Sequence, residues 1–270
     1  MKQSGSKDLK PILKWAGGKR QLIDHIIKKF PKSYNKFIEP FIGGGALFFY
    51  LNKNNSIISD INEDLINLYK QISKNPKKII LRIKNYKNTK DDFYTTRKSL
   101  PKNDLDRACR TIYLNKTCFN GLYRVNKKGE FNVPYGNYKN VSFFDENNLM
   151  EISKLLKQTK IIHGSYEMIL KRYAKKNDLI FLDPPYLPIS KYSDFKRYNK
   201  EQFYFEDHIN LSNLYKELDQ KGCYLILTNS NSEKIINLYK NYKISIYNTK
   251  RNINSIGNKR IGKDIIVTNF

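Results

Sequence analysis

Cysteine, histidine and long apolar runs are scarce in this sequence of 270 residues. The three cysteines, Cys109, Cys118 and Cys223, are too few and too far apart for a disulfide framework or a Cys-x-x-Cys metal site. The three histidines join no metal-ligand cluster. No apolar stretch approaches the roughly 20 residues that span a bilayer, and the polar N-terminus has no apolar signal region. We therefore expect a soluble, cytoplasmic protein that binds neither a metal nor a membrane.

Acidic residues are also in short supply. The chain has 25 Asp and Glu against 50 Lys and Arg, a formal net charge of +25, which favours a polyanionic partner. The abundant Lys, Asn and Ile are equally typical of low-GC codon usage, which raises lysine content without selection for binding. However, 20 Tyr and 15 Phe are interleaved with the charge, and basic grooves that bind unstacked bases need aromatic faces. Nucleic acid is the favoured partner.

Short apolar runs alternate with amphipathic helical patterns at the two ends of the chain. Residues 37–51, FIEPFIGGGALFFYL, predict a strand, a glycine turn and an apolar helix. Further strands are predicted at 56–59, 160–163, 179–182, 224–228, 243–247 and 265–269. This alternation is typical of an α/β protein with a doubly wound sheet.

The pattern between residues 63 and 159 is different, because helices follow one another without intervening parallel strands. We predict helices at 76–86, 91–100 and 103–116. Residues 120–136, NGLYRVNKKGEFNVPYG, contain two short extended runs around NKKG and predict a hairpin with a basic tip. The sheet is therefore expected to be interrupted by a helical insertion that carries a β-hairpin.

The most specific motif is Asp183-Pro184-Pro185-Tyr186, directly after the buried strand 179–182. Two prolines stiffen the backbone and remove two amide donors, which leaves acceptors beside an aromatic face. An exocyclic amine of adenine or cytosine can donate one hydrogen to the Asp183 carboxylate and the other to the Pro184 carbonyl, while Tyr186 stacks on the ring. Held in this way, the amine nitrogen can attack an electrophilic methyl group directly.

The glycine turn Gly43-Gly44-Gly45 and Asp60 end two other predicted strands. Ligands of open α/β sheets bind outside the carboxyl ends of strands. The glycines allow close approach of a ligand, and Asp60 is suited to bind ribose hydroxyls. Because Phe48 stands where a G-x-G-x-x-G motif has its third glycine, a nucleoside without a pyrophosphate is favoured.

Four segments in the same order resemble the DNA adenine methyltransferase family, which transfers methyl from S-adenosylmethionine to adenine N6, typically in GATC. Residues 13–22, LKWAGGKRQL, resemble its N-terminal cofactor motif, and residues 37–49 resemble its glycine motif. DPPY is similar to its catalytic motif, and residues 119–139 are similar to its target-recognition hairpin. The resemblance covers nearly the whole chain. It implies a Rossmann-like catalytic domain of residues 1–62 and 160–270, a target-recognition domain of residues 63–159, and a protein that is monomeric in solution.

The resemblance also implies roles for individual residues. Trp15 is expected near the cofactor adenine, Lys19 near the methionine carboxylate, and Asp60 on the ribose. The catalytic residues would be Asp183, Pro184, Pro185 and Tyr186. The cofactor site would comprise Trp15, Ala16, Gly17, Lys19, Glu39, Pro40, Phe41, Gly43, Gly45, Asp60 and Asp183.

Methylation of a paired adenine requires the base to leave the duplex. The resemblance places Phe119 as the aromatic residue that enters the duplex, where the family often has tyrosine, with Asn120 beside the vacated region. Arg124 is the best candidate for reading a guanine, since a guanidinium matches guanine O6 and N7 with two hydrogen bonds. The matching family lysine reaches the other guanine, which implies this role for Lys14.

The remaining predicted contacts to double-stranded DNA involve apolar groups and phosphates. Leu122 and Pro134 are expected to contact a thymine methyl group or base edges. Lys127 and Lys128, at the hairpin tip, are expected to contact phosphate and supply affinity without sequence information. Residues 254–260, NSIGNKR, resemble a family loop close to the DNA.

Two alternatives to adenine methylation stay open on the residues alone. The same acceptor geometry would serve cytosine N4, and a DNA-binding regulator could retain an inactive methyltransferase fold. Methylation at cytosine C5 is disfavoured, because it needs a nucleophilic cysteine, commonly after proline, and no cysteine follows one. A restriction-modification role and a housekeeping or phage role share the same chemistry.

Overall fold

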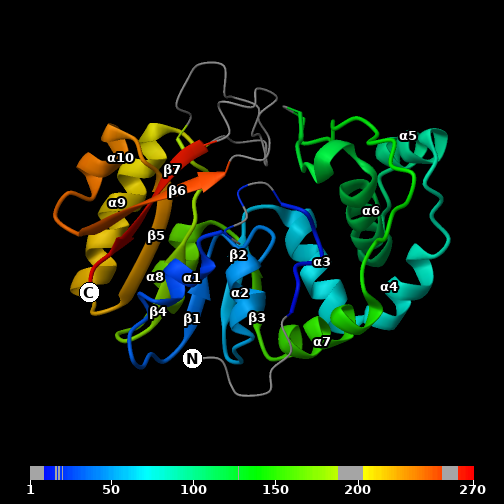
Figure 1. The fold of residues 1–270 in the computed structure, drawn as a ribbon. Coiled ribbons are helices and arrows are strands. Elements are labelled where there is room, and N and C mark those ends of the chain that lie inside the picture. Colours follow the sequence, from blue (N-terminus) through cyan, green and yellow to red (C-terminus); the bar gives the residue numbers. More distant parts are fainter. Residues whose placement is uncertain are drawn as a thin grey trace. The chain divides into compact units, whose positions relative to one another are not determined.

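The computed structural model describes residues 9–15, 17, 19, 21–126, 128–187, 203–250 and 261–270 (Figure 1). The helices and strands follow one another in this order: α1 Ile23–Ile27, β1 Phe37–Glu39, α2 Ala46–Leu51, β2 Ile57–Asp60, α3 Glu63–Lys74, α4 Pro76–Ile83, α5 Lys90–Lys98, α6 Asp104–Thr117, η1 Phe119–Gly121, α7 Glu146–Lys157, β3 Lys160–His163, α8 Tyr166–Tyr173, β4 Leu179–Leu182, α9 Phe205–Gln220, β5 Tyr224–Ser230, α10 Glu233–Leu238, β6 Lys243–Lys250 and β7 Ile261–Thr268.

The strands form a mostly parallel sheet of seven strands in the order β3-β2-β1-β4-β5-β7-β6. The predicted α/β fold class is confirmed. β1 and β5 both pair in parallel with β4, and β2 pairs in parallel with β3. β7 is antiparallel to both β5 and β6, and it lies between them although it follows both in the chain.

The chain divides into two compact units. Unit 1 contains residues 1–18, 42–164 and 197–200, and unit 2 contains residues 19–41, 165–196 and 201–270. Each unit is described by itself below. The division into a catalytic domain and a target-recognition domain at residues 63 and 159 stays a prediction.

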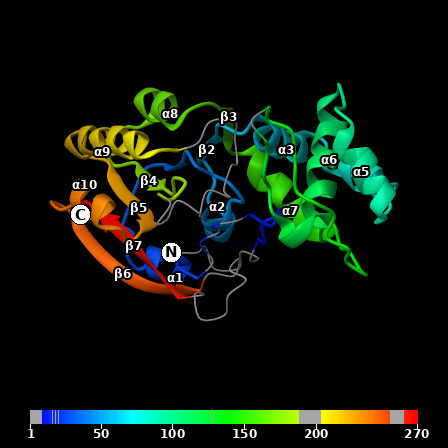
Figure 2. The same ribbon diagram turned by 90° about the horizontal axis from the view of Figure 1, so that it is seen from above.

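In unit 2, the apolar strands β1, β4 and β5 form the centre of the core. All four residues of β4 are buried, as expected for a parallel strand that is covered on both faces. Helices α8 and α9 lie on one face of the unit 2 strands and α1 lies on the other (Figure 2). Leu182 pairs with Leu227, so the carboxyl end of β4 brings the following Asp183 next to β5.

In unit 1, helices α3 to α7 pack around one another, and α3 and α7 also contact the short strand β3. Side chains that accept a hydrogen bond from the first helical turn explain where three of these helices begin. Asn62 accepts from Leu65 N, Asn103 accepts from Asp106 N, and Asp145 accepts from Asn148 N. These N-caps fix the start of α3, α6 and α7.

The predicted hairpin is shorter in the structure than its sequence pattern suggests. Pairing in residues 120–136 is an isolated antiparallel bridge between Val125 and Phe131, and a second bridge joins Cys118 to Tyr135. Asn126 N donates to Glu130 O at 2.9 Å, which closes the basic tip. Pro134 lies between the two bridges, and because it has no amide hydrogen it cannot donate to a strand ladder that would join them.

No helix within the described ranges is long and apolar enough to cross a membrane.

Candidate functional site

The predicted site residues are distributed over both units. In unit 2, the carboxylate of Asp183 follows β4 and receives two donors on the same oxygen. Lys19 Nζ lies 2.8 Å from Asp183 Oδ1, and Thr228 Oγ1 donates to Oδ1 at 2.8 Å. Pro184 is buried, and Pro185 and Tyr186 are half-buried. Lys19 and Thr228 therefore both bind Oδ1 of Asp183, and Oδ2 of the same carboxylate lies on the same rigid turn.

The Lys19 ammonium lies between the carboxylate and the aromatic ring of this motif. Its side chain is only 7% exposed, and Nζ lies 4.5 Å from the centre of the Tyr186 ring. Burial raises the pKa of Asp183, while Lys19 and the Thr228 hydroxyl oppose this rise by favouring the ionised form. The predicted cofactor ligand Lys19 is thus also the ionic partner of the predicted catalytic residue.

The end of β1 supplies three further predicted residues of unit 2. Glu39 and Pro40 are buried, and Phe41 is half-buried. The Phe41 ring stacks on Tyr166 with 5.1 Å between centroids, and Phe203 meets Phe41 edge-on at 6.0 Å. Phe41 thus belongs to an aromatic cluster, and the buried carboxylate of Glu39 lies two residues before it in the chain.

In unit 1, the glycine turn and Trp15 pack directly against each other. A Cβ atom on Gly43 would lie 2.9 Å from Cδ1 and Nε1 of Trp15, and a Cβ atom on Gly44 would lie 2.7 Å from Trp15 Cβ. Gly45 is the N-cap residue of α2, and the exposed Gly17 lies two residues beyond Trp15. Trp15 can therefore pack on this turn only because Gly43 and Gly44 have no side chains.

Asp60 ends β2 and bridges the glycine turn to the start of α3. Its Oδ2 accepts from Gly43 N at 3.1 Å, and its Oδ1 accepts from Asn62 N at 2.9 Å. Burial raises the pKa of Asp60 to about 6, against the opposing effect of these amides. Tyr69 Oη donates to Gly43 O at 2.6 Å and fixes the turn from its other side. The carboxylate is held in place with lone pairs left to accept further hydrogen bonds.

The 3-10 turn Phe119–Gly121 presents an exposed aromatic ring. Phe119 is 51% exposed, although its amide donates to Pro134 O at 2.9 Å. Asn120 adopts a left-handed conformation with φ of 55°, which asparagine tolerates better than most residues. Asn120 N donates to Tyr138 Oη at 2.8 Å, so the turn is anchored while the Phe119 ring faces solvent.

Lys14 lies against the same turn in unit 1. Asn115 Nδ2 donates to Lys14 O at 2.8 Å and Lys14 N donates to Asn115 Oδ1 at 2.9 Å. A Cβ atom on Gly121 would lie 2.6 Å from Lys14 Cβ, and Lys14 Nζ lies 5.2 Å from the centre of the Tyr138 ring. The structure thus brings Lys14 and the Phe119 turn together.

The guanidinium of Arg124 is oriented by the opposite side of the hairpin. Arg124 Nε donates to Asn132 Oδ1 at 2.8 Å, and Nη2 donates to Asn132 O at 3.4 Å. Leu122 is half-buried, whereas Pro134 and Lys128 are exposed. Three predicted contacts, Ala16, Lys127 and residues 254–260, lie outside the described residues.

Residues 15–253 match the model of the family described as D12 class N6 adenine-specific DNA methyltransferase. The chain belongs to this family. It is similar to the type II methyltransferase M.MjaIII of Methanocaldococcus jannaschii, with 43% identity over 94% of this chain and 96% of the relative. The DNA adenine methylase of Haemophilus influenzae is 33% identical over 96% of this chain and 94% of its own. That of Escherichia coli is 30% identical over 94% of this chain and 92% of its own.

Membership identifies this chain as an adenine-specific DNA methyltransferase, which acts on DNA and takes its methyl group from a donor. It favours adenine over the cytosine alternative, and an enzyme over an inactive regulator. Within the described part of the chain, no group of three or more His, Cys, Asp or Glu residues is placed to hold a metal ion.

Several residues that orient the predicted ones in this methyltransferase were not found by sequence reasoning. Thr228 holds Asp183, Asn132 holds Arg124, and Asn115 holds Lys14. A fourth, Tyr123, stacks on Trp15 with 5.0 Å between ring centroids. Only Tyr123 and Asn132 lie inside a recognised motif, and nothing in their local pattern separates them from ordinary hairpin residues.

Proposed function

We propose that this methyltransferase transfers the methyl group of S-adenosylmethionine to N6 of an adenine that is flipped out of double-stranded DNA, within GATC. The observation that carries the proposal is the arrangement at Asp183, where Lys19 and Thr228 both engage Oδ1. This supports an amine that donates one hydrogen to Oδ2 and the other to the Pro184 carbonyl, with Tyr186 stacked on the adenine ring.

Asp183 and Pro184 act by orienting the N6 amine of the adenine. Two acceptors in line with the N–H bonds of N6 draw its lone pair out of conjugation with the ring, so that the lone pair forms the new N–C bond. When bound, S-adenosylmethionine supplies an electrophilic methyl group whose carbon–sulfur electron pair remains on sulfur. N6 then loses one hydrogen as a proton to solvent. The rigid proline turn keeps both acceptors in place, because neither proline can rearrange its φ angle.

The residues present fit this cofactor. The Asp60 carboxylate, fixed by Gly43 N and Asn62 N, is suited to accept from two ribose hydroxyls. Trp15 offers an aromatic face for the cofactor adenine, and Lys19 contributes positive charge toward the methionine carboxylate. The side-chain-free turn at Gly43 and Gly44 lets Trp15 pack closely beside Asp60, whose Oδ2 accepts from Gly43 N. Ala16, Gly17, Glu39, Pro40, Phe41 and Gly45 complete the proposed cofactor site.

For DNA, the proposal assigns opening of the duplex and base reading to unit 1. The exposed Phe119 ring supports insertion into the stack when the adenine leaves, with Asn120 beside the vacated position. Arg124 reads one guanine and Lys14 the other, and Leu122 and Pro134 contact base edges or a thymine methyl group. Lys127 and Lys128 bind phosphate and contribute affinity without specificity.

Incubation with methyl-labelled S-adenosylmethionine and unmethylated duplexes tests the reaction. A duplex with GATC should be labelled, and duplexes with either guanine replaced should be labelled far more slowly. Asp183→Ala should abolish transfer while circular dichroism and DNA binding stay as in the wild type. Absence of labelling in any duplex that the wild type binds would contradict the proposal, and normal turnover by Asp183→Ala would remove Asp183 from its role.

Base flipping and biological role need separate measurements. A duplex with 2-aminopurine at the target adenine should become more fluorescent when the enzyme binds, and less so with Phe119→Ala. Relatives named type II methyltransferases support a restriction-modification role. DNA from cells that express the enzyme should then resist a restriction endonuclease that cleaves unmethylated GATC. Full cleavage of DNA that carries the methyl label would show a different target sequence.

A further inference from the structure

Tyr123, next to the proposed guanine reader Arg124, packs on the proposed cofactor residue Trp15. The two rings are stacked, with 5.0 Å between centroids and 26° between planes. Trp15 in turn lies on Gly43 and Gly44. Tyr123 is only 8% exposed, so its ring fills a defined space between the hairpin and Trp15. A displacement of the Trp15 ring must therefore displace Tyr123 as well.

The hydroxyl end of Tyr123 faces the turn that follows Asp60. Burial raises the pKa of this hydroxyl, and the side chains of Asn62 and Asp64 lie close enough to it to lower and to raise that pKa, respectively. Asn62 N donates to Asp60 Oδ1, and Asn62 Oδ1 caps α3 by accepting from Leu65 N at 3.0 Å. The same segment thus holds the proposed ribose ligand and the tyrosine of the hairpin.

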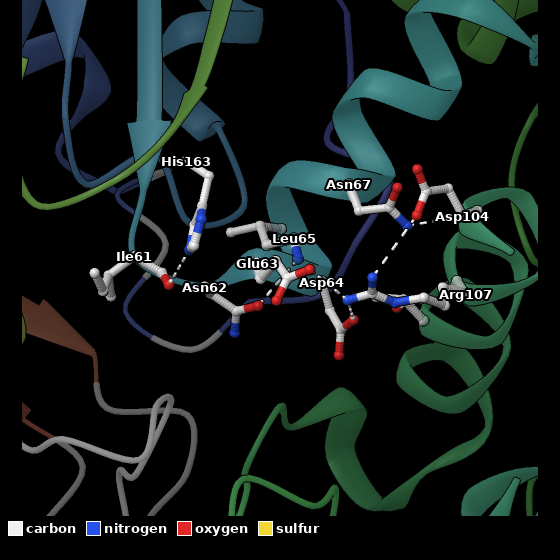
Figure 3. A network of polar contacts seen from close by, with 10 residues as sticks. Ile61, Asn62, Glu63, Asp64, Leu65, Asn67, Asp104, Arg107 and His163 are labelled. Carbon is white, nitrogen blue, oxygen red and sulfur yellow. Dashed lines mark hydrogen bonds and ion pairs between the residues drawn. The ribbon is translucent and has the colours of Figure 1, made fainter. Parts of the chain in front are cut away.

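Asp64 is itself held rigidly by a network that Figure 3 shows. Arg107 Nη2 donates to Asp64 Oδ1 at 2.9 Å and to Glu63 Oε1 at 3.0 Å, which joins α6 to the start of α3. Asn67 Nδ2 donates to Asp104 O at 2.8 Å and makes a second link between these helices. The carboxylate that faces the Tyr123 hydroxyl is therefore part of the helical framework and not a mobile surface group.

On the other side, Tyr123 is tied to the hairpin that carries Arg124. Its ring meets Phe131 edge-on at 5.6 Å, and Phe131 bridges to Val125. Asn132, which orients the Arg124 guanidinium, follows Phe131, and Asn132 N donates to Arg124 O at 3.0 Å. The position of Tyr123 thus constrains both sides of the hairpin at the level of Arg124.

We propose that Tyr123 is a positioning residue that couples occupation of the methyl-donor site to the reading of DNA sequence. The inference rests on the proposed function, because it takes Trp15 and Asp60 as cofactor ligands and Arg124 as the reader. A cofactor bound at Trp15 and Asp60 restricts the two surfaces that hold Tyr123, so less ordering remains when the hairpin engages its DNA sequence. By reciprocity, the specific DNA sequence tightens cofactor binding by the same factor.

The test measures dissociation constants of the full chain for a GATC duplex and a scrambled duplex, each with and without saturating S-adenosylhomocysteine. Wild type should bind the GATC duplex roughly 5- to 150-fold more tightly with S-adenosylhomocysteine. Tyr123→Leu should bring this factor to about one, and Tyr123→Phe, which keeps the ring and loses the hydroxyl, should give an intermediate factor. Tyr135→Phe is the matched control. It loses a hydroxyl bound to Asn88 O at 3.0 Å in the same segment, and it should keep the wild-type factor.

The chain's single tryptophan gives a second readout. Addition of the GATC duplex to the cofactor-free wild type should change the emission of Trp15, and addition of the scrambled duplex should change it much less. Tyr123→Leu should abolish this difference. A merely structural role for Tyr123 would lower thermal stability and would leave the coupling factor and the emission difference intact.

The outcomes separate this inference from the proposed function. If the wild type binds neither S-adenosylhomocysteine nor DNA, the proposed function fails, and the inference fails with it. If the wild type binds both ligands independently, or if folded Tyr123→Phe and Tyr123→Leu keep the full coupling factor, only the inference is overturned.

Discussion

Replacement of Thr228 by valine removes one hydrogen bond to the proposed catalytic carboxylate of Asp183 and almost nothing else. Thr228 is fully buried on β5, and its hydroxyl donates to Asp183 Oδ1 at 2.8 Å. Valine has nearly the same shape and keeps the methyl group that packs in the core. The variant should therefore fold normally and change the environment of Asp183 alone.

The size of the expected fall in kcat follows from the charge of the Asp183 carboxylate, which accepts the hydrogen bond from Thr228. Hydrogen bonds to charged groups contribute about 1.5–3 kcal/mol. The Thr228 hydroxyl favours ionised Asp183, so its loss raises the pKa of Asp183 further above the ordinary value, in the direction of the existing effect of burial. At acidic pH the ionised fraction, and with it kcat, should fall by roughly 10- to 150-fold. At alkaline pH both enzymes are ionised and the difference should largely vanish.

The assay is kcat against pH at saturating DNA and cofactor, with the labelled methyl group as readout. Thr268→Val is the matched control, because it removes another buried threonine hydroxyl of unit 2, which donates to Phe270 O at 3.5 Å. The control should keep the wild-type profile. The reasoning is refuted if Thr228→Val has the wild-type profile, or if its activity falls by the same factor at every pH.

Three further predictions address the other orienting contacts. Burial raises the pKa of Asp60 to about 6, and ribose hydroxyls donate to the ionised carboxylate. Calorimetry should therefore show that the affinity for the cofactor falls as the pH drops below about 6. Asp60→Asn should bind the cofactor weakly, and its affinity should not depend on pH in this range. Gly44→Ala should lower the free energy of unfolding by about 1–3 kcal/mol and shift the fluorescence emission of Trp15, because the new Cβ atom would lie 2.7 Å from Trp15 Cβ. An unchanged emission spectrum would contradict the packing argument. In competition binding, Asn132→Ala should lose about 1–3 kcal/mol of discrimination at one guanine, whereas Lys128→Ala should weaken binding to cognate and scrambled DNA alike. Equal losses of affinity for cognate and scrambled DNA in Asn132→Ala would show that Asn132 does not orient Arg124 for base reading.

Two parallel strands were the easiest elements to predict from the sequence. The predicted ranges 160–163 and 179–182 are the observed bounds of β3 and β4. β4 is buried in the middle of the sheet and gives an unbroken apolar run, whereas β3 lies at the edge, is exposed at both ends and shows only a short apolar pair. The proposed catalytic motif is visible in the sequence for a similar reason, because Asp183 to Tyr186 are contiguous and follow the apolar run of β4.

Polar residues inside the core caused one error in strand length, and the predicted strands 243–247 and 265–269 were also too short, since β6 ends at Lys250 and β7 begins at Ile261. The predicted strand 224–228 continues to Ser230 as β5, and Asn229 and Ser230 are buried there. A buried polar pair breaks the apolar pattern and looks like the end of a strand. The place of β7 between β5 and β6 was inaccessible for another reason, since strand order depends on pairing between distant segments.

Contacts between distant segments of the chain, which the sequence pattern does not reveal, also bear on the function of this enzyme. The motif residues are proposed to carry the reactive and reading groups, but single contacts from outside the local pattern set the direction of these side chains. Thr228 lies on β5, distant in the chain from Asp183, which follows β4, and Asn115 lies on α6, distant from Lys14. Substitutions at such positions leave every motif intact and still remove the hydrogen bond that aims a carboxylate or fixes a lysine. Rate and specificity should therefore be separable by mutation here, with Thr228 affecting turnover and Asn132 affecting the choice of sequence.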